Sequence, residues 1–197
     1  MRIGPAEHST ADGRTYASRT AQRRDTLAYL EFSRAIHEQE PHATIWESGE
    51  YEVTSEQIAD YVTWAAGDET GCCLVAVHGG RVVGAANLRG RTSMRTKHVV
   101  ELSAMVDSGW RRQGVARTLI GRVVAAAAEH PVIRKIMLRV FSPNTAALTL
   151  YEALGFLVEG RLRDHVRLDG CFADEIVMAL HVQQKPADSE NPVDDGR

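Results

Sequence analysis

The sequence predicts an α+β fold in which helices pack on a mixed, mostly antiparallel sheet. Segments with strand and helix periodicity follow one another in the order β-α-α-β-β-β-α-β-α-β-β. Two of the strand pairs are joined by turns at Gly79-Gly80 and at Asp169-Gly170, which favour tight antiparallel hairpins. The 197 residues suit one ordinary domain with a sizeable core, because 44% of them are apolar.

The first half of the chain is predicted to hold a strand, two helices and then three strands. The first helix has apolar residues at helical spacing and is followed by Pro41. The second opens with a capping-box pattern, Thr54 to Gln57, and ends near Gly67. The predicted strands are 14–19, 72–77, 82–88 and 98–106, and the first helix is 25–38.

The second half contains one long amphipathic helix, predicted at 113–129 and ended by Pro131. A strand at 135–141 and a helix at 143–154 follow, with Gly155 where a C-terminal cap belongs. Strands at 161–168 and 171–181 then face each other in the last hairpin. The apolar face of the long helix comprises Val115, Leu119, Ile120, Val123, Val124 and Ala127.

Charge and hydropathy exclude several classes of partner. A net charge of −3 gives no electrostatic reason to expect nucleic acid or an anionic membrane. No apolar run reaches the roughly 18 residues of a membrane span, and the N-terminus lacks a signal-peptide core, so we expect a cytoplasmic protein. Residues 1–13 are predicted to be a flexible leader, 14–182 the folded domain and 183–197 a disordered acidic tail.

Three cysteines, Cys72, Cys73 and Cys171, are an odd number with two adjacent members. This pattern suits buried thiols in a reducing compartment better than a disulfide framework. No zinc-type spacing is present, so no metal site is expected. A covalent route through a cysteine is disfavoured, because no His-Asp arrangement supports such a nucleophile.

The segment that carries chemistry joins the strand at 98–106 to the long helix. It reads Trp110-Arg111-Arg112-Gln113-Gly114-Val115-Ala116-Arg117. A helix start exposes backbone N–H groups and a partial positive charge, to which a pyrophosphate binds. Gly114 and Ala116 leave room for phosphates near the backbone, and the arginines add charge. The alternative is an ordinary helix start that contains arginine and glycine.

The spacing Arg111-x-x-Gly114-x-Ala116 resembles the coenzyme-A signature of the GNAT superfamily of N-acetyltransferases. It differs from a dinucleotide-binding fingerprint, whose first glycine comes three residues earlier, and it lacks the Gly-Lys-Ser/Thr of a nucleotide-binding loop.

Two further blocks are similar to the same superfamily. The first is Asn144-x-x-Ala147 with Leu150-Tyr151 and Gly155-Phe156, and the second is the closing hairpin from Glu159 to Glu175, as in the amino-acid, polyamine and ribosomal-protein acetylating branches. The resemblance covers 14–182. It implies a GNAT-type α/β/α sandwich, acetyl-CoA as acyl donor and, since many relatives pair, a homodimer.

The resemblance also implies residue roles. The backbone at the end of the strand at 98–106 would pair with the pantetheine arm, and one N–H there would polarise the thioester carbonyl. The helix start would hold the pyrophosphate, and Asn144 would hydrogen-bond the pantetheine region. The residues expected to bind the cofactor are Ala104, Met105, Val106, Arg111, Arg112, Gln113, Gly114, Val115, Ala116, Arg117 and Asn144.

Tyr151 lies where the family often places a phenol near the sulfur. A phenol has a pKa of about 10 and can donate a proton to the leaving thiolate. The alternative is core packing, because Tyr151 lies one helical turn from Ala147 and Leu154. Asn144 has an alternative role as well, as the residue that starts its helix.

The base that deprotonates the amine has three candidates. Glu101 leads, since strand alternation places it on the face opposite Leu102 and Val106. It could equally bind a cationic substrate or face solvent. His98 and Glu175 are the other candidates.

The predicted function is transfer of acetyl from acetyl-CoA to a primary amine, by direct attack on the thioester. A small amine is the favoured acceptor, and a protein N-terminus, as in ribosomal proteins, is the second. The rival from another class is a non-catalytic acyl-CoA-binding sensor. Among the tryptophans, Trp46 is a candidate for the acceptor pocket, Trp64 is expected in the core, and Trp110 is expected to anchor the loop.

Overall fold

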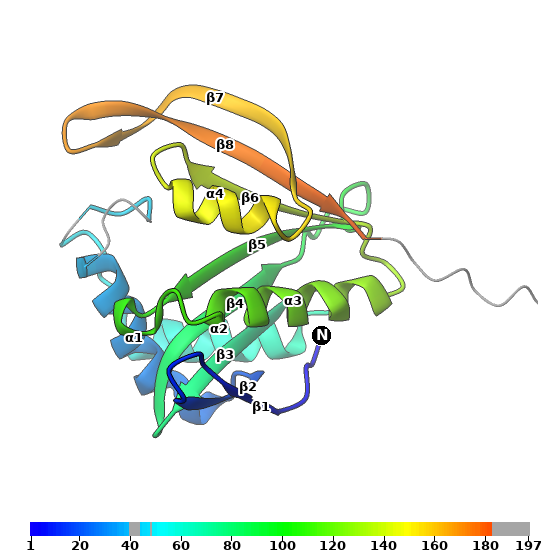
Figure 1. Ribbon diagram of the computed structural model, residues 1–197. Coiled ribbons are helices and arrows are strands. Elements are labelled where there is room, and N and C mark those ends of the chain that lie inside the picture. Colours follow the sequence, from blue (N-terminus) through cyan, green and yellow to red (C-terminus); the bar gives the residue numbers. More distant parts are fainter. Residues whose placement is uncertain (40–43, 48, 183–197) are drawn as a thin grey trace, which may run out of the picture.

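The computed structural model describes residues 1–39, 44–47 and 49–182. Within them, eight strands form one sheet in the order β1-β2-β3-β4-β5-β6-β8-β7 (Figure 1). The β5–β6 pair is parallel and the other neighbouring pairs are antiparallel, which confirms the predicted α+β class. The strands are β1 (Ala6–Ser9), β2 (Thr15–Thr20), β3 (Cys72–His78), β4 (Arg81–Arg89), β5 (Val99–Val106), β6 (Lys135–Phe141), β7 (Leu157–Leu168) and β8 (Cys171–His181).

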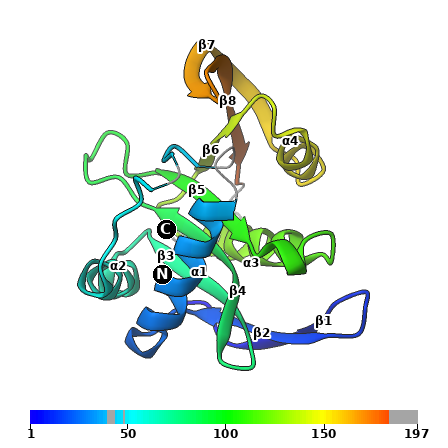
Figure 2. The same ribbon diagram turned by 90° about the vertical axis from the view of Figure 1, so that its left-hand side faces the viewer.

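Helices cover both faces of this sheet, as the α/β/α prediction required (Figure 2). Helices α1 (Thr26–Gln39) and α2 (Ser55–Gly67) lie on one face, and α3 (Val115–Glu129) and α4 (Thr145–Glu152) lie on the other. Strand alternation divides the core accordingly, so Leu74 packs with the α3 side. Its neighbours Cys73 and Val75 pack with α1 and α2. Two buried faces explain why β3 and β4 read as nearly continuous apolar runs.

Local signals set most element boundaries as predicted. Thr54 and Gln57 form the capping box at the start of α2, with bonds of 2.9 and 3.2 Å. Both residues of Gly79-Gly80 and of Asp169-Gly170 have positive φ angles, which tight hairpins require.

Three elements differ from the predicted bounds by two residues or more. Helix α3 starts at Val115 rather than 113, because Gly114 is its left-handed N-cap. Helix α4 is shorter than predicted, and β7 begins four residues before the predicted 161.

The predicted flexible leader is wrong for part of its length. Ala6–Ser9 forms β1, which pairs antiparallel with β2. The segment has no clear strand periodicity of its own, so its pairing depends on the edge that β2 presents. The predicted tail, 183–197, lies outside the described residues.

The cysteine prediction is right for two thiols and wrong for the third. Cys72 and Cys73 are buried, and burial raises the pKa of Cys72 to about 11. Cys171 is exposed beside the β7–β8 turn. No helix in the described part of the chain is long and apolar enough to cross a membrane.

Candidate active site

The sheet opens between β5 and β6. Their parallel ladder joins only Val99–Glu101 to the start of β6, although β5 continues to Val106. Beyond Glu101, the β6-facing edge of β5 has no strand partner among the described residues, so its backbone groups are available to a ligand. A groove of about 1950 Å³ occupies this opening. Its walls include Ala104, Met105 and Val106, together with residues from both helical layers.

The loop between β5 and α3 has the geometry of an anion cradle. The short helix η3 (Ser108–Trp110) leads into Arg111, and Arg112 and Gly114 then have φ angles of 61° and 83°. Gly114 is the N-cap of α3 and offers no side chain to the first-turn N–H groups. A Cβ at position 114 would meet no atom within 4 Å, so the space before the helix is open. These donors and the helix dipole fit a pyrophosphate.

The structure brings almost all the predicted cofactor residues to the groove. Gln113 is the exception, because it does not line the groove; its Oε1 is buried and has no hydrogen-bond partner within the described chain. Arg111 is tied back to β5, since its Nε donates to the carbonyl oxygen of Val106 at 3.1 Å. The cofactor residues that line the groove are Ala104, Met105, Val106, Arg111, Arg112, Gly114, Val115, Ala116, Arg117 and Asn144.

Helix α4 contributes the two polar residues of the second sequence block. The Oδ1 of Asn144 accepts a hydrogen bond from Ala147 N at 3.1 Å, so Asn144 caps α4, as its alternative role required. Its amide nitrogen takes no part in that cap. Tyr151 is buried against Phe156, with ring centroids 5.7 Å apart, and also lines the groove. Burial raises the pKa of Tyr151 to about 12, so the phenol stays protonated.

On the α1/α2 side of the groove, Glu101 and Ser103 project from β5, because Leu102 and Val106 are buried on the opposite face. Asn87 of β4 stands opposite Ser103 in the ladder. The Nδ2 of Asn87 lies 3.2 Å from the hydroxyl of Tyr29 and 3.4 Å from Ser103 Oγ. Its Oδ1 is buried and has no partner in the described part of the chain.

Sequence reasoning missed Asn87. The available signal was one amide residue inside the otherwise apolar strand 82–88. A buried unpaired carbonyl oxygen is costly unless a donor reaches it, so this atom is suited to accept from a bound ligand.

The three candidate bases differ in their position relative to the groove and in their partners. Glu101 and Glu175 line the groove, and His98 does not. The His98 backbone carbonyl accepts from Arg134 and Lys135 N, just before β5. Glu175 is 5% exposed, and its Oε2 lies 3.1 Å from Arg139 Nη1 and 3.6 Å from His165 Nε2. Glu175 is therefore already paired with the Arg139 guanidinium, whereas Glu101 forms no ion pair with another described residue.

Aromatic side chains form the wall of the groove near α1. The rings of His37 and Tyr51 stack with centroids 3.5 Å apart, and Trp46 lies 6.5 Å from Tyr51. All three line the groove. Trp64 does not lie in the core as predicted: it is 40% exposed, with the Arg89 guanidinium 5.7 Å from its ring. Trp110 is buried in the loop before the cradle, which confirms its anchoring role.

An anion cradle at a helix start, a split sheet edge and a buried phenol around one groove define a site of the coenzyme-A-dependent acyltransferase class. The chain belongs to the acetyltransferase (GNAT) family, whose sequence profile matches residues 32–156.

Two curated relatives are amino-acid acetylating proteins by name. L-amino acid N-acetyltransferase AaaT of Escherichia coli (strain K12) is 31% identical over 106 residues, 54% of this chain and 65% of that protein. N-acetylaspartate synthetase of Xenopus tropicalis is 40% identical over 96 residues, 48% of this chain and 34% of that protein. The matches thus span less than two thirds of either relative.

Solved structures share the fold over nearly their whole length. An acetyltransferase of the GNAT family from Streptococcus pneumoniae superposes with a TM-score of 0.80 at 22% identity, covering 84% of this chain and 98% of that one. The putative acetyltransferase yncA of Salmonella typhimurium, solved with its cofactor acetyl-CoA, gives 0.76 at 21% identity, covering 87% and 96%. Family membership confirms the predicted fold, the N-acetyltransferase class and acetyl-CoA as the donor of that class. The homodimer stays a prediction.

Proposed function

We propose that this chain is an acetyl-CoA-dependent N-acetyltransferase whose acceptor is the α-amine of a free amino acid. One observation carries the proposal. A single groove joins the cradle at the start of α3 to carboxylate and arginine side chains on the α1/α2 side. The connection runs through the opening between β5 and β6, where a thioester would lie between the two sets of groups.

The residues on the α3 side would hold the donor. Acetyl-CoA supplies the activated acetyl group as a thioester. The N–H groups from Arg112 to Arg117 would bind its pyrophosphate, and the open β5 edge at Ala104, Met105 and Val106 would pair with the pantetheine arm. An N–H on that edge would also bind the carbonyl oxygen as negative charge develops on it. Asn144 retains its amide nitrogen for the pantetheine region.

Glu101 would remove the proton from the acceptor ammonium. An alkyl ammonium has a pKa of about 10, so at neutral pH it must lose a proton before it can attack. Glu101 lies on the α1/α2 side of the opening, two residues before Ser103, which bonds Asn87. The unpartnered Asn87 Oδ1 would accept a second N–H of the same amine. The pair would therefore orient the nitrogen and take its proton, directly or through a water molecule.

Tyr151 would stabilise the leaving thiolate from the α4 side. Full proton transfer from a phenol of pKa about 12 to a thiolate of pKa about 8.5 is uphill by about 5 kcal/mol. Removal of the thiolate from water narrows that gap, because it raises the basicity of sulfur as well. A hydrogen bond from the phenol to sulfur, formed as charge develops, is therefore the main contribution of Tyr151.

Arg139 would bind the carboxylate of the amino acid. It projects from β6 into the groove, and its Nη1 contacts Glu175 while the remaining guanidinium N–H groups stay available. Planar guanidinium groups bind carboxylates in bidentate fashion. The names of the two curated relatives support an amino-acid acceptor.

The test compares amino acids with their decarboxylated amines, measuring CoA release. We expect wild-type kcat/KM to be at least tenfold higher for an amino acid than for the matching amine. Arg139→Ala should lower kcat/KM for the amino acid about 10- to 100-fold and abolish the preference, since a charge-assisted contact contributes about 1.5–3 kcal/mol. Arg167→Ala, an exposed arginine on β7 outside the groove, is the control and should leave both values unchanged.

Other outcomes select the alternatives. Faster acetylation of peptides with a free N-terminus than of any amino acid would favour a protein N-terminal acetyltransferase. Binding of acetyl-CoA without acceleration by any amine would favour the acyl-CoA sensor.

A further inference from the structure

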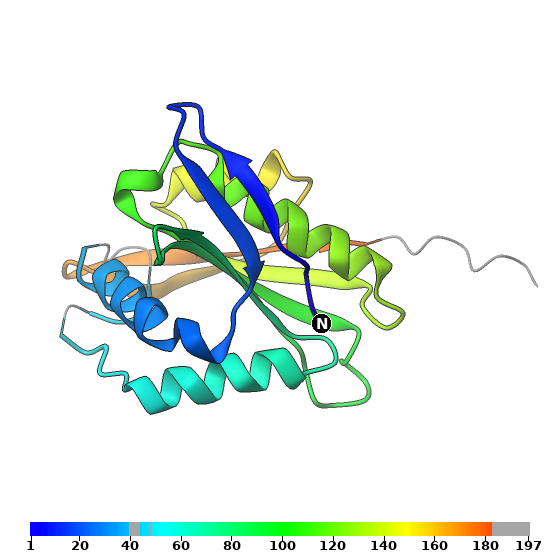
Figure 3. The same ribbon diagram turned by 90° about the horizontal axis from the view of Figure 1, so that it is seen from below.

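The turn between β1 and β2 packs against the loop that leads into the cradle. Figure 3 shows this hairpin crossing the molecule beside α3, with its turn close to the loop before that helix. The contact joins residues about 95 positions apart in the chain, as Arg14 reaches Gly109. The hairpin has no role in the proposed chemistry. Its contact point, Gly109, nevertheless lies only two residues before Arg111.

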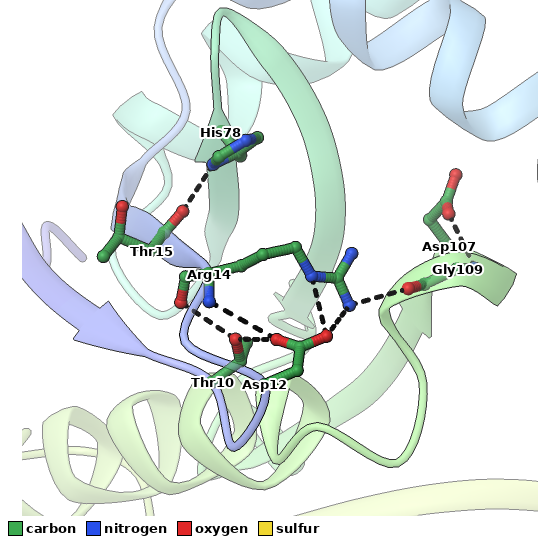
Figure 4. Close-up of polar contacts among 7 residues, drawn as sticks. All are labelled: Thr10, Asp12, Arg14, Thr15, His78, Asp107 and Gly109. Carbon is green, nitrogen blue, oxygen red and sulfur yellow. Dashed lines mark hydrogen bonds and ion pairs between the residues drawn. The ribbon is translucent and has the colours of Figure 1, made fainter.

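Arg14 makes the central contact, and the turn around it fixes its guanidinium (Figure 4). The Nη2 of Arg14 donates to the carbonyl oxygen of Gly109 at 3.0 Å. The Nε and Nη2 of Arg14 lie 2.9 and 2.7 Å from Asp12 Oδ2. Hydrogen bonds from Arg14 and from the Thr10 hydroxyl hold the pKa of Asp12 well below its usual value, so the carboxylate stays charged. Asp12 therefore fixes the position of the Arg14 guanidinium that contacts the loop.

The same guanidinium covers the aromatic residue of the loop. Its central carbon lies 4.1 Å from the ring centroid of Trp110. Tyr16 meets that ring edge-on, with centroids 6.2 Å apart, and the His78 ring lies at 4.9 Å. The Nδ1 of His78 lies 2.5 Å from the backbone oxygen of Thr15, which ties it to the hairpin (Figure 4). The Trp110 ring is thus contacted by the β1–β2 turn, by β2 and by the end of β3.

The N-terminal segment also contacts α3 farther along the helix. Arg122 donates to the carbonyl oxygen of Gly4 at 2.6 Å and to that of Ser18 at 2.7 Å. Arg122 lies eight residues after Gly114, which corresponds to about 12 Å of helix. The segment that carries the cradle is consequently fixed both before it, at Gly109 and Trp110, and after it, at Arg122.

We infer that Arg14 is a positioning residue for coenzyme A, and that the β1–β2 hairpin supports the donor site although it does not line the groove. Cradle residues Arg112 and Gly114 have left-handed φ angles, which a free loop adopts at a disadvantage, above all at a residue with a side chain. A loop that is ordered beforehand binds more tightly, because ordering no longer opposes binding. The inference rests on the proposed use of the cradle for coenzyme A.

The experiment measures coenzyme-A binding by calorimetry for wild type, Arg14→Ala and Arg2→Ala. Arg2 is exposed in the same N-terminal segment and carries the same charge, so it controls for long-range electrostatics. We expect Arg14→Ala to raise the Kd about tenfold and Arg2→Ala to leave it within about twofold. In steady state, KM for acetyl-CoA should rise for Arg14→Ala, while kcat and the acceptor KM stay near wild type.

A second pair of variants separates positioning from stability. Asp12→Asn keeps Arg14 but removes the negative charge of its partner, and we expect an intermediate Kd. Arg14→Lys retains a charge without the forked contact to Asp12 and Gly109, and should not restore full affinity. A lowered Tm with unchanged Kd in Arg14→Ala and Asp12→Asn would overturn the inference, because the hairpin would then be only structural. Absence of coenzyme-A binding by the wild type would instead overturn the proposed function.

Discussion

The two sides of the groove are built in different ways. On the α3 side, the predicted pyrophosphate donors are backbone N–H groups of one short segment, Arg112 to Arg117. On the α1/α2 side, the strands alone contribute polar side chains from five different elements, with Asn87 on β4, Glu101 on β5, Arg139 on β6, His165 on β7 and Glu175 on β8. A helix start can bind a phosphate by itself, whereas recognition of an amine and a carboxylate needs side chains from several elements.

The difference makes separable predictions for binding and chemistry. Changes on the α3 side should alter donor affinity, and changes on the α1/α2 side should alter turnover and acceptor selectivity. Tyr151 lies on the α3/α4 side but lines the groove at the opening, so a change there should alter turnover although the residue belongs to the donor side.

The largest expected effect is on the α1/α2 side, in Glu101→Gln. Loss of a general base typically lowers the rate 10²- to 10⁴-fold, and we expect kcat to fall by about that factor. The Kd for acetyl-CoA should stay within about twofold, because Glu101 lies outside the cradle. Glu175→Gln is the matched comparison. If it abolishes turnover while Glu101→Gln remains active, the base is Glu175 and the present assignment is wrong.

On the α3 side, Gly114→Leu should weaken coenzyme-A binding about 100-fold. The new side chain would occupy the open space before the helix, at a φ of 83° that L-residues disfavour by about 1–2 kcal/mol. Gly121→Leu in the middle of α3 is the control, since the space there is also open and its φ is not positive. Calorimetry measures the affinity for coenzyme A, and the midpoint of thermal unfolding reports any destabilisation that the strained backbone causes. Equal affinity of a folded Gly114→Leu and the wild type would remove the pyrophosphate from this site.

Tyr151→Phe should have the smallest effect, a fall of about tenfold in kcat with nearly unchanged acetyl-CoA affinity. The substitution removes one hydrogen bond and keeps the packing against Phe156. Because burial raises the pKa of Tyr151 to about 12, the wild-type rate should show no alkaline fall from this phenol well below that pH. Wild-type turnover in the variant would leave Tyr151 with a packing role only.

The features that depend on near neighbours in the chain could be predicted from the amino-acid sequence. Periodicity predicted α1, α2 and α3, and turn chemistry predicted the hairpins at Gly79-Gly80 and Asp169-Gly170. The cradle was also predictable, because Arg111, Gly114 and Ala116 belong to one strand-to-helix connection. Each of these rests on backbone preferences that act over a few residues.

The features that depend on contacts between distant segments became visible in the folded chain. Glu101 and Glu175 line the groove, whereas His98 does not. Asn87 has a buried Oδ1 without a partner among the described residues, and Asn144 caps α4. Part of the predicted leader forms β1, and Arg14 donates a hydrogen bond to the carbonyl oxygen of Gly109. The physical reason is that strand pairing and side-chain hydrogen bonds form between residues whose separation in the chain carries no information about their distance in space.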